Sequence, residues 1–199
     1  MTDYETQISE LQKKLDPKFV KDPPQGKYGQ YIEGWHAISE ANRIFGHDGW
    51  AYDVVSVTQT NAEQDGPKHR IGYMAHVKVN AMGTVRGDVG HGQGFGKSLG
   101  DAHDSAVKEA VTDALKRALR TFGNPFGLAL YDKTQANVGV DATDAELDTV
   151  TENINACQTM DELQKFWVAL AANHKHIAAH KDIIAAKDVR KFEIQERSQ

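Results

Sequence analysis

The clearest pattern of polar and apolar positions lies at residues 70–80, where apolar and polar side chains alternate strictly. Such alternation predicts a β-strand with one buried face. A turn at residues 81–83 leads into a second, shorter strand pattern at residues 84–89. In this second strand we expect Val85 and Val89 to face the interior. The two segments together predict an antiparallel hairpin.

A further strand is predicted at residues 50–58, which are rich in β-branched and aromatic side chains. The polar segment at residues 61–67 predicts a loop between this strand and the hairpin. One face of the hairpin is apolar, and we expect the other to carry Arg70, Lys78 and Arg86. Antiparallel sheets with one solvated face show this distribution.

Two helices are predicted ahead of the sheet, at residues 3–15 and 33–45, because their apolar side chains recur with the 3.6-residue helical period. In the second of these helices we expect Trp35, Ile38 and Phe45 to be buried. The Pro- and Gly-rich segment between the two helices predicts a loop.

The longest helical pattern covers residues 98–122 and begins at Ser98, with Asp101 placed three residues later as in a capping box. A proline at position 125 cannot continue the helical ladder, so the helix ends before it. On a helical wheel, one arc of this helix is apolar and contains Val107, Val111, Ala114, Leu115, Ala118, Leu119 and Phe122. The opposite arc carries Lys116, Arg117 and Arg120.

The composition of the chain changes after residue 133, where four acidic residues appear without a basic one among them. Two capping boxes follow, Thr143 with Glu146 and Thr159 with Glu162, and each opens a helical pattern. We therefore expect an α+β domain at residues 1–133, a linker at 134–141 and a small helical module at 142–199.

Composition and charge limit the possible classes of protein. The 199 residues are 40% apolar and 26% charged, which is typical of a globular chain. A single cysteine, Cys157, excludes an internal disulfide framework. No apolar run approaches the ~20 residues of a membrane span, and the polar N-terminus resembles no targeting peptide. We therefore expect a cytoplasmic protein with no membrane contact.

The net charge of −5 is distributed unevenly along the chain. Residues 66–133 hold ten Lys and Arg against six Asp and Glu, whereas residues 1–65 and 134–199 are both acidic. A local basic surface is therefore compatible with the acidic total.

A glycine-rich segment that ends in Gly96-Lys97-Ser98 suggests a phosphate-binding loop. Such a loop needs a glycine five positions before Gly96, and that position is His91. Close backbone packing explains the glycines better. An NTP-dependent enzyme that uses Gly96-Lys97-Ser98 remains as an alternative.

The sequence offers no strong case for catalysis or metal binding. His176 and His180 would share a helix face, but only His174 could serve as a third ligand. No nucleophile signature is present. We expect no catalytic residue, no metal and no cofactor.

The basic arc of the long helix is the best candidate site. Asp113 can pair with Lys116 or Arg117, but three cations against one acid leave an excess of positive charge. Repeated, spaced positive charge is what a phosphate backbone requires. The alternative is an amphipathic helix with an ordinary solvated face.

The chain contains four longer motifs, which are Tyr31-Ile32-Glu33-Gly34, Phe45-Gly46-His47-Asp48-Gly49-Trp50, Asp88-Val89-Gly90-His91-Gly92, and the segment from Lys108 to Asn124, KEAVTDALKRALRTFGN. In this order they closely resemble the Rad52/Rad22 family of single-strand annealing proteins. The resemblance covers roughly residues 5–133, and we take the chain for a short member of phage or prophage type.

The resemblance implies a β-β-β-α core, homo-oligomeric rings or filaments, and single-stranded DNA in a basic groove. By position, Lys116, Arg117 and Arg120 match the family's inner DNA-binding helix, and Tyr31 matches its groove aromatic. Lys68, Lys97 and Lys133 fall where the family places further basic contacts. Lys21 is the nearest counterpart of an arginine in the loop before the Tyr31 motif. A basic residue that the family carries near position 137 is Asn in this chain.

The resemblance therefore predicts ATP-independent binding and annealing of single-stranded DNA in recombination and repair. It does not extend to residues 134–199, for which we expect contact with a partner such as a single-strand binding protein. A helical interaction scaffold without DNA binding is a further alternative. A phage-encoded protein would act in the cytoplasm of a bacterial host.

Overall fold

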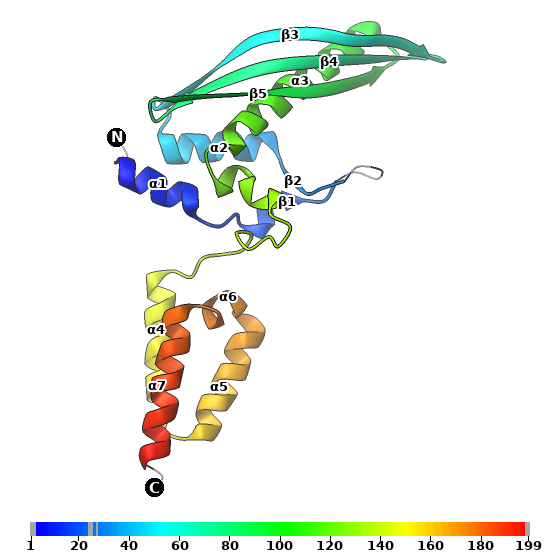
Figure 1. Cartoon of the computed structure of the whole chain (residues 1–199). Coiled ribbons are helices and arrows are strands. Elements are labelled where there is room, and N and C mark those ends of the chain that lie inside the picture. Colours follow the sequence, from blue (N-terminus) through cyan, green and yellow to red (C-terminus); the bar gives the residue numbers. More distant parts are fainter. Residues whose placement is uncertain (1–2, 24–25, 27, 198–199) are drawn as a thin grey trace. The chain divides into compact units, whose positions relative to one another are not determined.

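The computed structural model of the protein describes residues 3–23, 26 and 28–197. The chain forms two compact units, Met1–Val138 and Gly139–Gln199 (Figure 1). Each unit has its own hydrophobic core. No helix within the described residues is long and apolar enough to cross a membrane.

The first unit is built on a three-stranded antiparallel sheet packed against one long helix. Strands β3 (Trp50–Asp65), β4 (Lys68–Ala81) and β5 (Thr84–Gly96) lie in the order β3-β4-β5. Helix α3 (Leu99–Arg120) covers one face of β4 and β5 (Figure 1). The predicted α+β class with a β-β-β-α core is confirmed.

Helix α3 approaches β5 so closely that side chains are missing from the contact. A Cβ atom added at Gly90, Gly92 or Gly94 would lie under 3.0 Å from the backbone of α3. On the helix side, the contact is made by a fully buried stripe of alanines at four-residue spacing, Ala102, Ala106, Ala110 and Ala114. The glycine-rich segment is therefore a strand that permits close packing, as the sequence favours.

This arrangement also differs from the βαβ context of a phosphate-binding loop. Gly96 ends an antiparallel strand, whereas a P-loop joins a strand to a helix in a βαβ unit. The Ser98 side chain accepts a hydrogen bond from the backbone N–H of Asp101 and caps α3. The NTP-dependent alternative therefore has no support from the fold.

The predicted orientation of residues at the start of β5 is wrong. Val85 and Val89 are exposed. Arg86 instead pairs with the buried Val79 of β4 and lies on the α3 side, where its guanidinium covers the Phe122 ring at 4.6 Å. The glycines that face α3 determine which residues of β5 point toward the helix. Because glycine has no side chain, these positions show no hydrophobic pattern from which the orientation could be predicted.

Strand β3 is longer than predicted, because residues 61–65 pair with β4 rather than forming a loop. The turn is confined to the two residues after Asp65, with Gly66 at a φ of 60°. Two register shifts interrupt the pairing of β3, after Val54 and after Gln59. Strand β3 lies at the sheet edge and is exposed almost throughout, so its polar residues need no buried partners.

Helix α2 (Gly34–Phe45) buries a different arc of its surface from the one predicted. Phe45 is buried, as expected, and stacks on Phe126 with ring centroids 5.7 Å apart. The predicted burial of Trp35 and Ile38 is wrong, since both side chains are exposed. The buried face consists of His36, Ala37, Ala41, Ile44 and Phe45.

Short elements complete the first unit and surround the end of α3. Leu15 forms a β-bridge with Val138, and the Leu15 N–H donates to the Asn137 carbonyl at 2.8 Å. This bridge holds the chain after residue 133 against the first unit. The elements are α1 (Tyr4–Gln12), the 3-10 turns η1 (Pro17–Phe19), η2 (Asn124–Phe126) and η3 (Leu128–Tyr131), and the strand pair β1 (Val20–Lys21) and β2 (Tyr31–Ile32).

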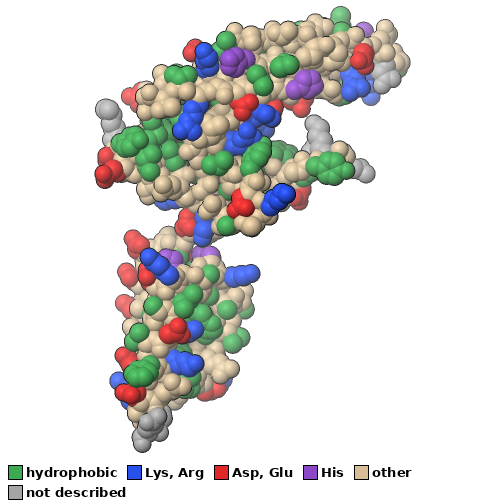
Figure 2. All heavy atoms as spheres, in the orientation of Figure 1, with side chains coloured by type: hydrophobic (Ala, Val, Ile, Leu, Met, Phe, Trp, Pro, Cys, Tyr) green, Lys and Arg blue, Asp and Glu red, His purple; other side chains and the backbone are tan. Residues whose placement is uncertain are grey.

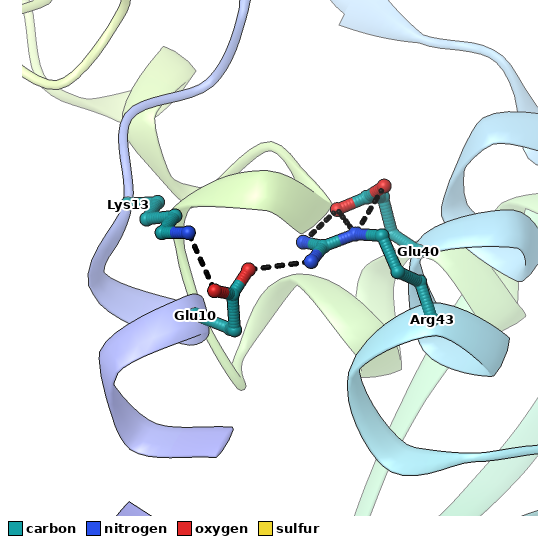
Figure 3. A network of polar contacts seen from close by, with 4 residues as sticks. All are labelled: Glu10, Lys13, Glu40 and Arg43. Carbon is teal, nitrogen blue, oxygen red and sulfur yellow. Dashed lines mark hydrogen bonds and ion pairs between the residues drawn. The ribbon is translucent and has the colours of Figure 1, made fainter. Parts of the chain in front are cut away.

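A network of ion pairs joins α1 to α2 (Figure 3). The Glu10 carboxylate binds both Lys13, at 2.5 Å, and Arg43. Arg43 also pairs with Glu40 at 2.7 Å. Burial alone would raise the pKa of Glu10, but the hydrogen bonds from Lys13 and Arg43 hold this pKa below its usual value.

All regular elements described in the second unit, up to residue 197, are helices. Both predicted capping boxes are formed, one at Thr143 and one at Thr159. Arg190 is buried and donates two hydrogen bonds, of 2.8 and 2.9 Å, to the Cys157 carbonyl. The helices are α4 (Asp144–Ala156), α5 (Met160–Asn173), α6 (Lys175–Ala178) and α7 (Lys181–Arg197).

Candidate nucleic-acid interface

A groove in the first unit brings together four of the residues predicted to bind DNA. Helix α3 supplies Lys116, Arg117 and Arg120 to one wall, and β2 supplies Tyr31. The turn η3 adds Tyr131. Figure 2 shows Lys and Arg side chains gathered in the hollow beneath the sheet, next to hydrophobic and acidic ones.

Lys116 and Tyr31 form one cation–aromatic pair in this groove. The Lys116 ammonium lies 5.6 Å from the centroid of the Tyr31 ring and 3.4 Å from the Ile32 carbonyl oxygen. Tyr31 remains 36% exposed, so its ring is accessible from the groove. A cation and an aromatic ring are placed where a nucleotide could use both, through its phosphate and its base.

Arg117 and Arg120 share one carboxylate, that of Asp88 on β5. Arg117 Nε lies 3.3 Å from Oδ1 of Asp88, and Arg120 Nη2 lies 3.6 Å from Oδ2. The Arg117 side chain is 43% exposed and that of Arg120 only 19%. The helical wheel predicts that these cations lie on a solvated arc. In the structure, β5 and η3 cover part of their side chains.

The carboxylate of Asp113 also lies at the groove, where it accepts a hydrogen bond of 3.4 Å from the backbone N–H of His91 at the edge of β5. Three cations of α3 therefore meet two carboxylates, which leaves one unit of positive charge. Such a groove attracts phosphate only modestly in a single chain.

Tyr131 is a groove residue that the sequence reasoning missed. The Arg120 guanidinium lies 4.1 Å from the centroid of the Tyr131 ring and donates a hydrogen bond to its hydroxyl. No periodic pattern marks Tyr131, because it lies in a short 3-10 turn. Asp88 was also missed, since its partners lie 29 and 32 positions further along the chain.

Comparison with known protein families identifies the family of this chain. The family model described as "Rad52/22 family double-strand break repair protein" matches residues 3–147. The chain belongs to the Rad52/Rad22 family. The resemblance inferred from the four sequence motifs is therefore confirmed.

Individual family members are similar to this chain over about 130 residues. The DNA repair and recombination protein RAD52 of Kluyveromyces lactis is 44% identical over 131 residues, which are 63% of this chain and 30% of that protein. RAD52 of Saccharomyces cerevisiae is 42% identical over 131 residues, 63% of this chain and 27% of that protein. For rad22 of Schizosaccharomyces pombe the identity is 38%, over 63% of this chain and 28% of that protein. The chain thus spans less than a third of the length of these relatives.

Two further candidates in this Rad52/Rad22 family chain lie near the groove. Lys21 is the register partner of Tyr31 in the β1–β2 pair. Directly opposed residues in an antiparallel pair project from the same face, so Lys21 and Tyr31 share one side of this ribbon. Lys133 is exposed two residues beyond Tyr131.

The remaining candidates, Lys68 and Lys97, lie at the other end of the sheet. His69 pairs with Gly96, so Lys68 and Lys97 flank the last register pair of β4 and β5. Lys97 precedes α3, whose 22 residues span about 33 Å, and Lys116 lies in its last turns. The structure does not bring Lys68 and Lys97 into the groove.

Metal-ligating side chains do not converge in the part of the chain that the structure describes, where no three His, Cys, Asp or Glu side chains could hold a metal ion. The rings of His174 and His176 lie 6.4 Å apart in the second unit.

Proposed function

We propose that this chain binds single-stranded DNA in the groove along α3 and anneals complementary strands, without ATP, in DNA recombination and repair. The observation that carries the proposal is the convergence of Tyr31, Lys116, Arg117 and Arg120 on one groove. Membership of a family whose relatives are named DNA repair and recombination proteins supports the biological role.

Annealing requires no covalent step. The cations of α3 neutralise phosphates, and bases left free of hydrogen bonds to the protein remain available for pairing. Binding would be independent of sequence and sensitive to salt, because released counterions supply most of its free energy.

A homo-oligomeric ring or filament would compensate for the weak charge of a single groove. Identical grooves along one strand act at a high effective concentration, so modest affinities multiply. Lys68 and Lys97 would contact DNA at a second place on each protomer, away from the groove.

The central test is the removal of single groove cations. We expect Lys116→Ala and Arg120→Ala each to lower the affinity for an oligothymidine at least tenfold at moderate salt and to abolish annealing. Lys165→Ala is the matched control, because Lys165 is an exposed lysine of the second unit paired with Asp161. Light scattering should show unchanged oligomers. Unchanged DNA affinity in both groove variants would refute the proposal.

The helical second unit has a separate role in this proposal, as a docking module for a protein partner such as a single-strand binding protein. A chain that ends at Val138 should keep its DNA binding and lose the partner in a pull-down. The scaffold alternative predicts instead that DNA binding is absent from both forms.

A further inference from the structure

Tyr131 is the most exposed aromatic side chain that lines the groove, with 67% of its surface accessible. One face of its ring is covered by the Arg120 guanidinium, at 4.1 Å from the centroid. Because so much of the ring is exposed despite this contact, the other face is open to a ligand.

The two cation–aromatic pairs of the groove follow one ridge of α3. Lys116 and Arg120 are four residues apart, so they lie on the same face of the helix, about 6 Å apart along its axis. Lys116 accompanies Tyr31 of β2, and Arg120 accompanies Tyr131 of η3. The groove thus presents two aromatic rings, each with a cation beside it.

We propose that Tyr131 is a second base-stacking residue of the groove, which holds a nucleobase on the ring face opposite Arg120. Every base has a π-face, so an exposed aromatic ring accepts it without regard to sequence. The adjacent guanidinium is then positioned for the phosphate of the same nucleotide. This inference rests on the proposed function, because it names the part of the DNA that this residue contacts.

The test separates contacts to bases from contacts to phosphates. The full chain is titrated with an oligothymidine and with an abasic phosphodeoxyribose oligomer of equal length, by fluorescence anisotropy. We expect Tyr131→Ala to lower the affinity for oligothymidine at least fivefold and to leave the affinity for the abasic oligomer unchanged. Tyr131→Phe keeps the ring and should bind both as the unsubstituted chain does.

Tyr4→Ala is the control, because Tyr4 is an exposed tyrosine of α1 that does not line the groove. The inference is overturned if Tyr131→Ala weakens both oligomers equally, which would indicate an effect through Arg120, or if it weakens neither. If the unsubstituted chain binds neither oligomer, the proposed function fails and this inference fails with it. Normal binding by the unsubstituted chain with no effect of Tyr131→Ala overturns this inference alone.

Discussion

Asp88 limits the positive charge that the groove can offer to DNA. Its carboxylate lies between the Arg117 and Arg120 guanidiniums, at 3.3 and 3.6 Å, and also accepts a hydrogen bond of 2.7 Å from the Val89 N–H. Asp88→Asn removes the negative charge and keeps both the shape and an acceptor oxygen. The excess charge of the groove then rises from one to two.

The expected size of the effect follows from the distance between Asp88 and a bound phosphate. A phosphate on the far side of the two guanidiniums would lie roughly 7 Å from the carboxylate, with a repulsion of about 0.6 kcal/mol in water and about 2.4 kcal/mol at an effective dielectric constant of 20. Because both arginines are partly exposed, the repulsion in the groove is closer to the value in water. Relief of about 1 kcal/mol corresponds to roughly fivefold tighter binding.

The assay is a salt titration of oligothymidine binding by fluorescence anisotropy. We expect the slope of log affinity against log salt concentration to steepen by about 0.7 for Asp88→Asn, as one more counterion is released. Asp104→Asn is the control, since Asp104 is an exposed aspartate of α3 paired with Lys108. Weaker binding with an unchanged slope would refute the reasoning, because it would show that Asp88 orients the guanidiniums more than it competes with phosphate.

Two other predictions concern the fold of the first unit. Gly92→Val would drive a side chain into the backbone of α3 and should destabilise the protein by about 3 kcal/mol, measured by urea unfolding, whereas Gly100→Ala meets only ordinary contacts and should change stability by less than about 1 kcal/mol. Glu10→Gln should cost less than about 1 kcal/mol at neutral pH, as for exposed ion pairs. Because Lys13 and Arg43 hold the pKa of Glu10 below its usual 4.5, the ionised carboxylate stabilises the fold above that pH, and this contribution is lost as the pH falls through the lowered pKa. The variant should therefore lose less stability than the unsubstituted chain between pH 5 and pH 3 in the same unfolding assay. Equal losses of stability in the two proteins over this pH range would contradict the stabilising role of the ionised Glu10.

Periodicity predicted the elements of the fold better than it predicted which faces are buried. The alternation at residues 70–80 located β4 within two residues at each end. The inward-facing residues of β5 were predicted wrongly. A shift of one residue moves every side chain of a strand to the opposite face of the sheet, and glycines do not indicate which face is buried. Trp35 and Ile38 were placed inside because hydrophobicity alone does not show which arc of α2 meets a neighbour.

The groove was predictable only in part, and for similar reasons. Lys116, Arg117 and Arg120 belong to one helix, so their spacing alone places them together. Tyr31 emerged only from the family resemblance. Asp88 and Tyr131 reach these cations through tertiary contacts, which no local pattern encodes.

The glycine–alanine seam between β5 and α3 has a consequence for how the groove tolerates change. Most protein cores absorb a substitution by switching neighbouring rotamers, but this contact is formed by main-chain atoms and methyl groups, which have no rotamers to switch. The helix axis is therefore held at a nearly invariant height above the strand. Substitutions elsewhere can alter which charges the ridge of α3 carries, while the spacing between those charges stays the same.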